Sequence, residues 1–401
     1  MLRSGSICIS FLYKYLTSEN KTVDKEGYKT LEKRSNKLKC LSDTFQNYGG
    51  VLAKLSQILS SDNEDHKVFS ECKPFSEQKT IEFLKKEYND NDFLKNVEEL
   101  DFSVFKSGSV GQVHKAIYKN NNIVLKVQYV GLLEQVKTDL FILDQITNYL
   151  FSFSDLSNAM LDIKTKLHEE LDYKIELSNQ LLMYKLWSND VSIKIPKIIL
   201  ELCNDKILGM DYIDANSLTY FINNSTQEEK NNIAENLIRF VFTNIYKHKI
   251  FYSDIHYGNF LVKNNKELYA MDFGCLINLD NDLHSNLINL HLSVLDENID
   301  LFYTILENMK IINKSISEKS KIYLYEYFKL QYMPIISDNF EFTEEWLKKS
   351  DYKDTELMKE WNLPPNMVYL NKIPFGLYNI LTKLNAKGNF KKIFDKLLKD
   401  L

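Results

Sequence analysis

Arginine is scarce in this chain, and the chain carries no net positive charge. Arginine occurs only at Arg3, Arg34 and Arg239, although lysine and arginine together number 50. Because 55 acidic residues outweigh these bases, the formal net charge is −5 and the pI is about 5.9. Nucleic-acid binding normally leaves a basic footprint, so we expect no nucleic-acid partner. Lysine is so abundant that a single lysine carries little information by itself.

Cysteines are few and poorly spaced for a metal site or a disulfide framework. The chain has five, none of them in a CxxC pair: Cys8, Cys40, Cys72, Cys203 and Cys275. An odd number of separated cysteines is typical of free thiols in a reducing compartment. We therefore expect an intracellular protein with free, buried thiols.

Long apolar runs are also missing. No stretch approaches the about 18 residues that a membrane-spanning helix needs. The start, MLRSGSICISFLYKYLTSENK, has one arginine and no acid before Glu19, and it fits either a weak transit peptide or an ordinary helix. With 44% hydrophobic residues, the 401-residue chain can bury a sizeable core.

The spacing of apolar residues changes along the chain. VLAKLSQILSS and TIEFLKKEYNDNDFL, within the first 100 residues, show helical spacing. Residues 101–130 are rich in β-branched and aromatic residues and predict a hairpin joined by an Asn turn, with a glycine-bearing turn at its front. Long amphipathic helices are predicted over 132–151 and 155–187. A second hairpin is predicted in IPKIILELCNDKILGMDYI, around Asn204-Asp205.

This order of elements predicts the fold class. From about residue 216 the pattern is helical, interrupted by short loops over 252–274. We predict an α+β, protein-kinase-like bilobal fold. Its parts are a helical extension (1–100), an N-lobe with a small antiparallel sheet (101–212) and a mostly helical C-lobe (213–401).

Three polar side chains stand out in YSDIHYGNFLVKNNKELYAMDFG, residues 252–274. Asn259 follows Asp254 by five residues, and Asp272 follows Asn259 by thirteen. Carboxylate and amide oxygens suit Mg²⁺, and this D-x4-N plus DFG spacing is typical of protein kinases. We predict that Asn259 and Asp272 bind Mg²⁺ and that Asp254 orients or deprotonates the acceptor. Alternatively, Asp254 caps a turn and Asp272 ends a strand.

A glycine-bearing turn precedes this constellation. It matches the frame G-x-G-x-x-G-x-V, with Lys106 in the first slot and glycines at Gly108 and Gly111. We predict that backbone N–H groups here approach phosphates; the alternative is a plain hairpin turn. The predicted nucleotide-binding residues are Lys106, Ser107, Gly108, Ser109, Val110, Gly111, Val113, Lys126, Met210 and Tyr212.

A lysine in an apolar strand needs a partner. Lys126 lies in IVLKV, and a buried ammonium is costly unless it is paired. HEELDYKIELSNQ supplies acidic residues at helical spacing, of which Asp172 and Glu176 share a face. We predict that Glu176 pairs with Lys126, and that Lys126 binds the α- and β-phosphates of ATP. For the other acidic residues of this segment a solvated helix face is the simpler reading.

Five ordered segments together resemble the UbiB/ADCK family of atypical kinases, which is tied to ubiquinone and other isoprenoid-lipid metabolism. They are SVGQVHKA, VLKVQY, EELDYKIE, DIHYGN and MDFG. The resemblance implies ATP and Mg²⁺ as cofactors, peripheral contact with membrane lipid, a lipid-biosynthesis complex as partner and a mitochondrial or membrane-associated location. It also implies regulatory roles for Lys54 and Gln57, in the K-x-G-Q position, and for Glu170 and Asp172, the E-x-D pair.

The chain departs from that family at several positions. Ser56 replaces the glycine of K-x-G-Q, and Gly108 stands where relatives usually carry alanine. In the catalytic loop, Tyr252 replaces a histidine and Tyr257 a proline. No proline occurs between Gly274 and Met333, so the Ala-Pro-Glu element that anchors a peptide-binding segment in ordinary protein kinases is missing. We therefore do not expect a protein substrate docked in the usual way.

Two other functions stay open at this stage. A small-molecule kinase of the aminoglycoside or choline kinase type shares D-x-H-x-x-N-x-L, but it does not need the Lys54/Gln57 helix. An ATP-dependent, non-catalytic scaffold for a lipid-modifying complex would keep Mg-ATP binding without a phosphorylated product. In all three functions Lys126, Asn259 and Asp272 must reach one nucleotide.

Overall fold

The structure is a computed structural model, and its described part falls into two compact units. It describes residues 76–87, 97–108, 110–129, 131–132, 136–138, 141, 171–351, 357, 360–362 and 373–399. The first unit holds the described residues up to Ser178 together with Lys197–Tyr212, and the second holds Asn179–Pro196 and the chain from Ile213 onward. The division falls inside helix α8 (Tyr173–Trp187).

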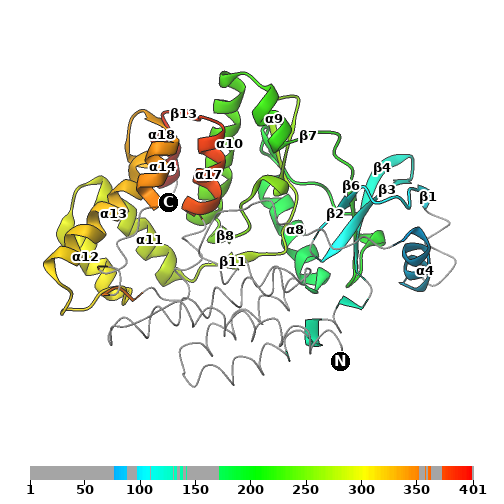
Figure 1. Cartoon of the computed structure of the whole chain (residues 1–401), viewed down its shortest axis with the longest axis horizontal. Coiled ribbons are helices and arrows are strands. Elements are labelled where there is room, and N and C mark those ends of the chain that lie inside the picture. Colours follow the sequence, from blue (N-terminus) through cyan, green and yellow to red (C-terminus); the bar gives the residue numbers. More distant parts are fainter. Residues whose placement is uncertain are drawn as a thin grey trace, which may run out of the picture. The chain divides into compact units, whose positions relative to one another are not determined.

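The first unit is built on one antiparallel sheet. Its strands run in the order β1-β3-β4-β6, with β2 beside β3 (Figure 1). Their bounds are β1 Val97–Leu100, β2 Lys106–Ser107, β3 Gly111–Tyr118, β4 Asn121–Gln128 and β6 Ile207–Asp211. The predicted hairpin is confirmed, because β3 and β4 pair throughout and Lys119 and Asn120 turn between them with positive φ. Such a two-residue turn matches the twist of the flanking strands.

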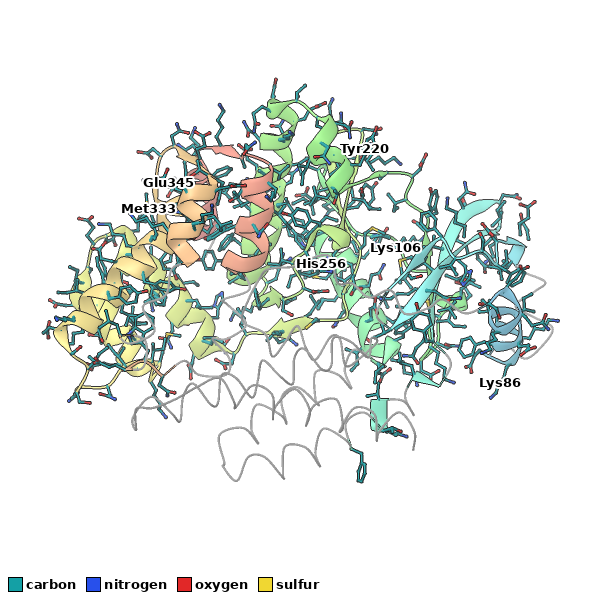
Figure 2. All side chains as sticks on the ribbon, in the orientation of Figure 1. Lys86, Lys106, Tyr220, His256, Met333 and Glu345 are labelled. Carbon is teal, nitrogen blue, oxygen red and sulfur yellow. The ribbon has the colours of Figure 1, made fainter. Side chains whose placement is uncertain are left out.

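Helix α4 (Glu77–Glu87) covers one face of this sheet. Phe83 and Leu84 pack against Ile123, Leu125 and Val127, while Lys86 lies exposed on the outer side of the helix (Figure 2). This packing leaves the opposite face of the sheet, which carries Lys126, for the small apolar cluster described below.

The second predicted hairpin is wrong in its first arm. Only β6 is a strand, whereas Leu200–Leu202 forms the 3-10 helix η1 and pairing is limited to a bridge between Ile198 and Met210. Leu202 packs so closely on Gly209 that a Cβ at position 209 would lie 2.5 Å from the Leu202 Cβ. The chain therefore turns over β6 and does not run beside it as a strand.

The second unit contains most of the helices and three small sheets. The sheets have the strand orders β5-β10-β9-β7, β11-β8 and β12-β13. The strands are β5 Ile193–Lys194, β7 Asn216–Ser217, β8 Ile250–Tyr252, β9 Phe260–Lys263, β10 Glu267–Ala270, β11 Leu276–Asn278, β12 Phe340–Glu341 and β13 Lys387–Gly388. The α-helices are α9 Leu218–Asn224, α10 Gln227–Tyr246, α11 Asn281–Leu295, α12 Ile299–Asn308, α13 Glu318–Ile336, α14 Glu344–Asp351, α17 Asn379–Lys383 and α18 Lys391–Lys399.

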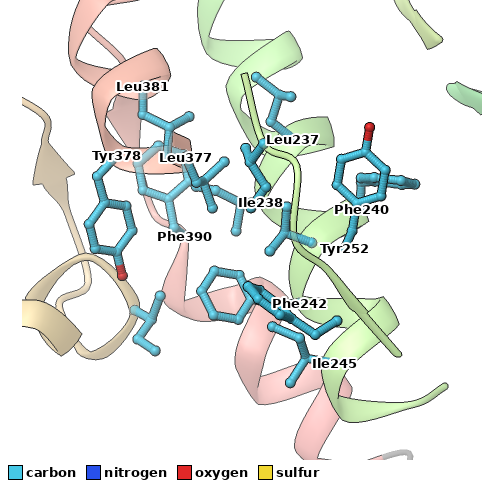
Figure 3. Packing of buried hydrophobic residues seen from close by; sticks show 14 of the residues in the cluster. Leu237, Ile238, Phe240, Phe242, Ile245, Tyr252, Leu377, Tyr378, Leu381 and Phe390 are labelled. Carbon is cyan, nitrogen blue, oxygen red and sulfur yellow. The ribbon is translucent and has the colours of Figure 1, made fainter. Parts of the chain in front are cut away.

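Helix α10 lies at the centre of this unit. Its start is fixed by a capping box, in which Thr226 accepts from the Glu229 N–H and Glu229 accepts in return from the Thr226 N–H. Its apolar residues pack against β8 and against the C-terminal residues Leu377, Leu381 and Phe390 (Figure 3). The core of the unit thus joins segments that lie more than a hundred positions apart in the sequence.

The remaining sequence predictions, on helices, cysteines and membrane-spanning segments, can be compared with the structure only where it describes the chain. Most of the helix predicted over 132–151 lies outside the described residues, as do positions 155–170 of the following one, whose end is confirmed by α8. The two described cysteines, Cys203 and Cys275, are half-buried thiols that form no disulfide within the described residues. Within the described ranges, each helix is too short or too polar to cross a bilayer.

A buried histidine in the second unit gives a pH-dependent stability. His291 is fully buried, its Nδ1 lies 3.1 Å from the Tyr246 hydroxyl, and its ring stacks on Tyr246 and Tyr332. Burial lowers the pKa of His291 to about 4. The unfolded chain takes up this proton near pH 6.5 while the folded chain does not. Stability is therefore lost as the pH falls from about 6.5 towards 4.

We expect His291→Phe to remove that loss. Over this pH range the native protein should lose about 3 kcal/mol more of its unfolding free energy than the variant. At pH 7.5 the variant should be the less stable of the two, because Tyr246 loses its partner. Urea denaturation at a series of pH values measures both quantities, and parallel pH curves would refute the assignment.

Candidate functional site

The Lys126–Glu176 pair is present in the first unit. Lys126 on β4 lies opposite Val113 on β3 and Leu208 on β6. Its Nζ donates to Glu176 Oε1 at 2.5 Å, and only 17% and 4% of the two side chains are exposed. A charge pair with so little water contact is costly to desolvate, so its presence is weak evidence for a role in stability.

An apolar cluster surrounds this ion pair on the same face of the sheet. It includes four predicted nucleotide-binding residues packed around Val124 and Leu208: Val110, Val113, Met210 and Tyr212. Alternation along the strands places them there, since residues two apart in a strand share a face. The face therefore combines apolar surface with one buried cation, a combination suited to a nucleobase and its phosphates.

Tyr173 is a site residue that the sequence reasoning missed. Its ring is fully buried in the same cluster, and Lys126 Nζ lies 5.3 Å from the ring centroid. A cation over an aromatic face is stabilised by the ring quadrupole. A local signal did exist, because Tyr173 precedes Glu176 by three residues and so shares its helix face.

The glycine loop is held by a backbone hydrogen bond and a side-chain hydrogen bond. The Gly108 N–H donates to the Gly111 carbonyl at 2.8 Å, and the Tyr129 hydroxyl donates to the Gly108 carbonyl at 3.3 Å. Lys106 lies at the entry of the loop, on β2 (Figure 2). Ser109 lies outside the described residues.

The two loop glycines differ in the space around them. A Cβ on Gly111 would lie 2.5 Å from both the Tyr173 hydroxyl and the Val127 carbonyl oxygen, whereas one on Gly108 would meet only the Gly111 carbonyl oxygen, at 3.5 Å. We expect Gly111→Ala to cost about 1–3 kcal/mol of stability, because overpacking forces the backbone to shift, and to weaken nucleotide binding. Gly108→Ala, the matched control, should stay within about 0.5 kcal/mol.

Thermal unfolding and nucleotide titration measure these effects. If the two alanine variants behaved alike, the close approach at Gly111 would have no energetic meaning. If Gly108→Ala were the more damaging change, the assignment of the two positions would be reversed.

In the second unit, a β-hairpin explains the spacing between Asn259 and Asp272. Strands β9 and β10 pair with Phe260 opposite Ala270. The Met271 N–H then donates to the Asn259 carbonyl at 3.0 Å, which extends the pairing by one step. Asn259 and Asp272 therefore leave the same end of one hairpin.

The loop between β8 and β9 orients its side chains through internal hydrogen bonds. The Asn259 amide donates from Nδ2 to both the carbonyl and the carboxylate of Asp254, each at 2.9 Å. A carboxylate only accepts, so Nδ2 must face Asp254 and Oδ1 is the end of the amide that can ligate a cation.

His256 lies in the same loop (Figure 2), and its hydrogen bonding defines its tautomer. Its Nδ1 accepts from the Gly258 N–H at 3.0 Å, so the proton of the neutral ring is on Nε2, which lies 3.4 Å from Asp254 Oδ2. A Cβ on Gly258 would approach this ring to 2.9 Å. Glycine here permits the hydrogen bond that orients the imidazole toward Asp254.

Hydrogen bonds from Gly274 and Asn179 fix Asp272 and the neighbouring Phe273. Asp272 Oδ1 accepts from the Gly274 N–H at 3.0 Å, and the fully buried Phe273 accepts at its carbonyl from Asn179 Nδ2 at 2.9 Å. Asn179 on α8 is a second residue that the sequence reasoning missed. It follows Glu176 by three positions, so helical spacing could have indicated it.

Tyr252 fills the core beneath these loops. Its ring packs against Phe240, Phe260 and Phe273, and the hydroxyl is buried without a hydrogen bond of normal geometry. Burial, and then the carboxylates of Asp272 and Asp254, raise the pKa of this hydroxyl far above its usual range. Tyr252 is therefore a neutral residue beside two carboxylates.

The donor set of the second unit fits magnesium bound together with a polyphosphate. Among the described residues, no group of three or more His, Cys, Asp or Glu side chains could hold a metal ion alone. Asn259 and Asp272 offer hard oxygens from one end of a hairpin. Magnesium is commonly held by one or two such groups plus phosphate oxygens and water.

Most of the regulatory residues suggested by the resemblance lie in parts of the chain that the structure does not describe. Lys54, Gln57 and Glu170 lie outside the described residues. Asp172 accepts the Lys174 N–H at 2.9 Å, beside the start of α8. The roles assigned to all four stay predictions.

Comparison with protein families identifies the domain. A family model described as the ABC1 atypical kinase-like domain matches residues 67–305, a span that contains Lys126, Glu176, Asp254, Asn259 and Asp272. The match thus covers more than half of the chain and both groups of predicted residues.

Curated relatives carry related names. The chain is 22% identical over 188 residues to "Atypical kinase COQ8B, mitochondrial" of Rattus norvegicus, covering 46% of this chain and 35% of that protein. It is 24% identical over 262 residues to "Atypical kinase COQ8, mitochondrial" of Saccharomyces cerevisiae, covering 62% and 52%. The alignments thus span between about a third and a half of these relatives.

A solved structure shares the fold. The structure of Rv3197 in complex with erythromycin, from Mycobacterium tuberculosis, matches with a TM-score of 0.70 at 20% sequence identity, covering 81% of this chain and 84% of that one. The predicted α+β kinase-like fold is confirmed. The predicted boundaries at 100/101 and 212/213 stay predictions.

Proposed function

Since the chain belongs to the ABC1 atypical kinase-like domain family, we propose that it binds Mg-ATP and acts as a phosphotransferase or ATPase. The Lys126–Glu176 ion pair carries this proposal. It is nearly excluded from water, and Lys126 lies on the apolar face of the sheet that carries four of the predicted nucleotide-binding residues. The Lys126 ammonium can bind the α- and β-phosphates of a nucleotide while Glu176 holds it in place.

The loops of the second unit supply the remaining roles. Asn259, through Oδ1, and Asp272 would hold Mg²⁺, which when bound neutralises charge on the phosphates. Asp254 would orient the nucleophile, and the Asn259 amide on its carboxylate fixes the direction of that group. His256 would support the same carboxylate, since its Nε2 proton faces Asp254 Oδ2, the oxygen that also accepts from Asn259.

The chain after Gly274 favours a small acceptor or water. Ordinary protein kinases place a long peptide-binding segment here, but in this chain β11 follows directly and α11 begins at Asn281. A hydroxyl on a small or lipid molecule can reach Asp254 without such a platform, and so can water. We propose an acceptor of this kind, in isoprenoid-quinone metabolism as the family resemblance implies, in or beside a lipid-biosynthesis complex at a membrane surface.

The fate of the γ-phosphate tests this function. Purified full-length protein is incubated with γ-labelled ATP and Mg²⁺, with and without phenolic quinone precursors and lipid vesicles. We expect label in free phosphate or in a small molecule, and none without Mg²⁺. Label on the protein or on an added protein substrate would contradict the proposed acceptor class.

The same experiment separates a non-catalytic scaffold from an enzyme. A scaffold would bind Mg-ATP, measured by titration calorimetry, but leave the label in ATP under every condition. If neither binding nor turnover occurred, the nucleotide function itself would be wrong.

A further inference from the structure

The segment Ile373–Lys383 lies beyond the region matched by the family model, yet it contacts the predicted catalytic loop. It consists of the π-helix η3 (Ile373–Tyr378) followed by α17. Leu377 and Leu381 are fully buried against α10 (Figure 3), and the Tyr378 hydroxyl donates to the Gln331 carbonyl on α13 at 3.0 Å. The segment is thus anchored in the core of the second unit.

The backbone of η3 lies directly against the loop. A Cβ on Gly376 would be 2.4 Å from the Ile255 carbonyl oxygen and 2.9 Å from the Ile255 Cβ. Ile255 is buried and stands between Asp254 and His256. Only glycine allows this approach, because any side chain at position 376 must displace the loop or the π-helix.

A hydrogen bond joins the two segments a short distance away. The Tyr257 hydroxyl donates to Asn379 Oδ1 at 2.9 Å. Tyr257 is the first residue of the 3-10 helix η2 (Tyr257–Asn259), whose last residue is the predicted magnesium ligand. A hydrogen bond that restrains Tyr257 therefore also restrains the turn that orients Asn259.

We propose that the Ile373–Lys383 segment is a positioning element for the catalytic loop, acting through Gly376 and through the Tyr257–Asn379 hydrogen bond. The inference deepens the proposed function and rests on it for its catalytic meaning. The segment fixes the backbone between Asp254 and Asn259, at Ile255 and Tyr257, so that the carboxylate and the amide oxygen keep one orientation when Mg-ATP binds. Single-turn π-helices are rare in proteins, and those that occur are often found at functional sites. The position of η3 beside the predicted catalytic loop agrees with this tendency.

The test measures the loop first and the chemistry second. Amide hydrogen exchange of full-length protein is followed in peptides that cover residues 254–260. The Gly258, Asn259 and Phe260 N–H groups are hydrogen-bonded there and report local opening. We expect Gly376→Ala to raise exchange about ten-fold and Tyr257→Phe or Asn379→Ala about three-fold.

Matched controls come from the same unit. A Cβ on Gly388 meets nothing closer than 3.7 Å, so Gly388→Ala makes the same chemical change without a clash. Tyr220 on α9 is 54% exposed, so Tyr220→Phe removes a hydroxyl at the surface. Neither should change exchange in the loop. Equal loop exchange in Tyr257→Phe, Asn379→Ala and the controls would overturn the proposal, even if Gly376→Ala failed to fold.

Kinetics then separate positioning from general stability. In Tyr257→Phe we expect the apparent KM for Mg²⁺ to rise about five-fold and kcat to fall by a similar factor, while the midpoint of thermal unfolding matches that of Tyr220→Phe. A lower unfolding midpoint with unchanged kinetics would reduce the contact to ordinary packing and refute the proposal. If the wild type neither bound nor consumed ATP while loop exchange still rose, the proposed function would fail and the structural coupling would stand.

Discussion

Asp272→Asn is expected to lower Mg²⁺-dependent ATP turnover about a thousand-fold, equivalent to about 4 kcal/mol of transition-state stabilisation. The change removes the negative charge of a predicted metal ligand. It keeps an oxygen at the Oδ1 position, which can still accept the Gly274 N–H. The fold should therefore persist while the affinity for magnesium falls.

Steady-state kinetics across a magnesium series measure this effect. Asp282→Asn is the matched control, because Asp282 is exposed in the first turn of α11 and lies outside the predicted site. It should keep wild-type turnover. If Asp272→Asn retained both turnover and magnesium dependence, the assignment of Asp272 as a ligand would be wrong, and so would the function built on it.

Lys126→Met is expected to destabilise the first unit by about 3–5 kcal/mol and to abolish ATP binding. The methionine fills most of the space but leaves the Glu176 carboxylate, only 4% exposed, without its cation. The double variant Lys126→Met/Glu176→Met should recover most of the stability, since apolar residues often replace a buried ion pair at little cost. It should not recover ATP binding.

Denaturant unfolding of Lys126→Met, Glu176→Met and the double variant gives the coupling energy of the pair. The exposed pair Lys119–Glu201 is the control, because its side chains are 64% and 65% exposed. Lys119→Met should cost no more than about 1 kcal/mol. A Lys126→Met protein as stable as Lys119→Met would show that the buried Glu176 carboxylate does not depend on Lys126. ATP binding by the double variant would exclude Lys126 from the site.

Local sequence patterns were sufficient for much of the fold. The β3/β4 hairpin was predictable because alternating β-branched residues flank a short polar turn, and the Lys126–Glu176 pair because a charge in an apolar strand needs a partner. The second hairpin failed at Leu200–Leu202. There the close contact of Leu202 with Gly209, and not the intrinsic preference of the residues, decided the conformation.

The residues of the candidate site also fall into those that local sequence patterns indicated and those that they did not. Asn259 and Asp272 could be recognised by spacing, and their shared hairpin explains the thirteen residues between them. Tyr173 and Asn179 lie at helical spacing from Glu176 but are not acidic, so the need of Lys126 for an anionic partner did not indicate them. Gly376 and Asn379 had no local signal at all.

By itself, the sequence determined the residue types that magnesium and a triphosphate require, their order along the chain and the strands and turns that carry them. These properties depend on neighbours a few positions apart, where periodicity and turn chemistry act. Only the tertiary structure decided that Tyr173 lies beneath Lys126 and that the backbone at Gly376 presses on Ile255. Such contacts join segments far apart in the chain, and close packing of the core selects them without leaving a local pattern.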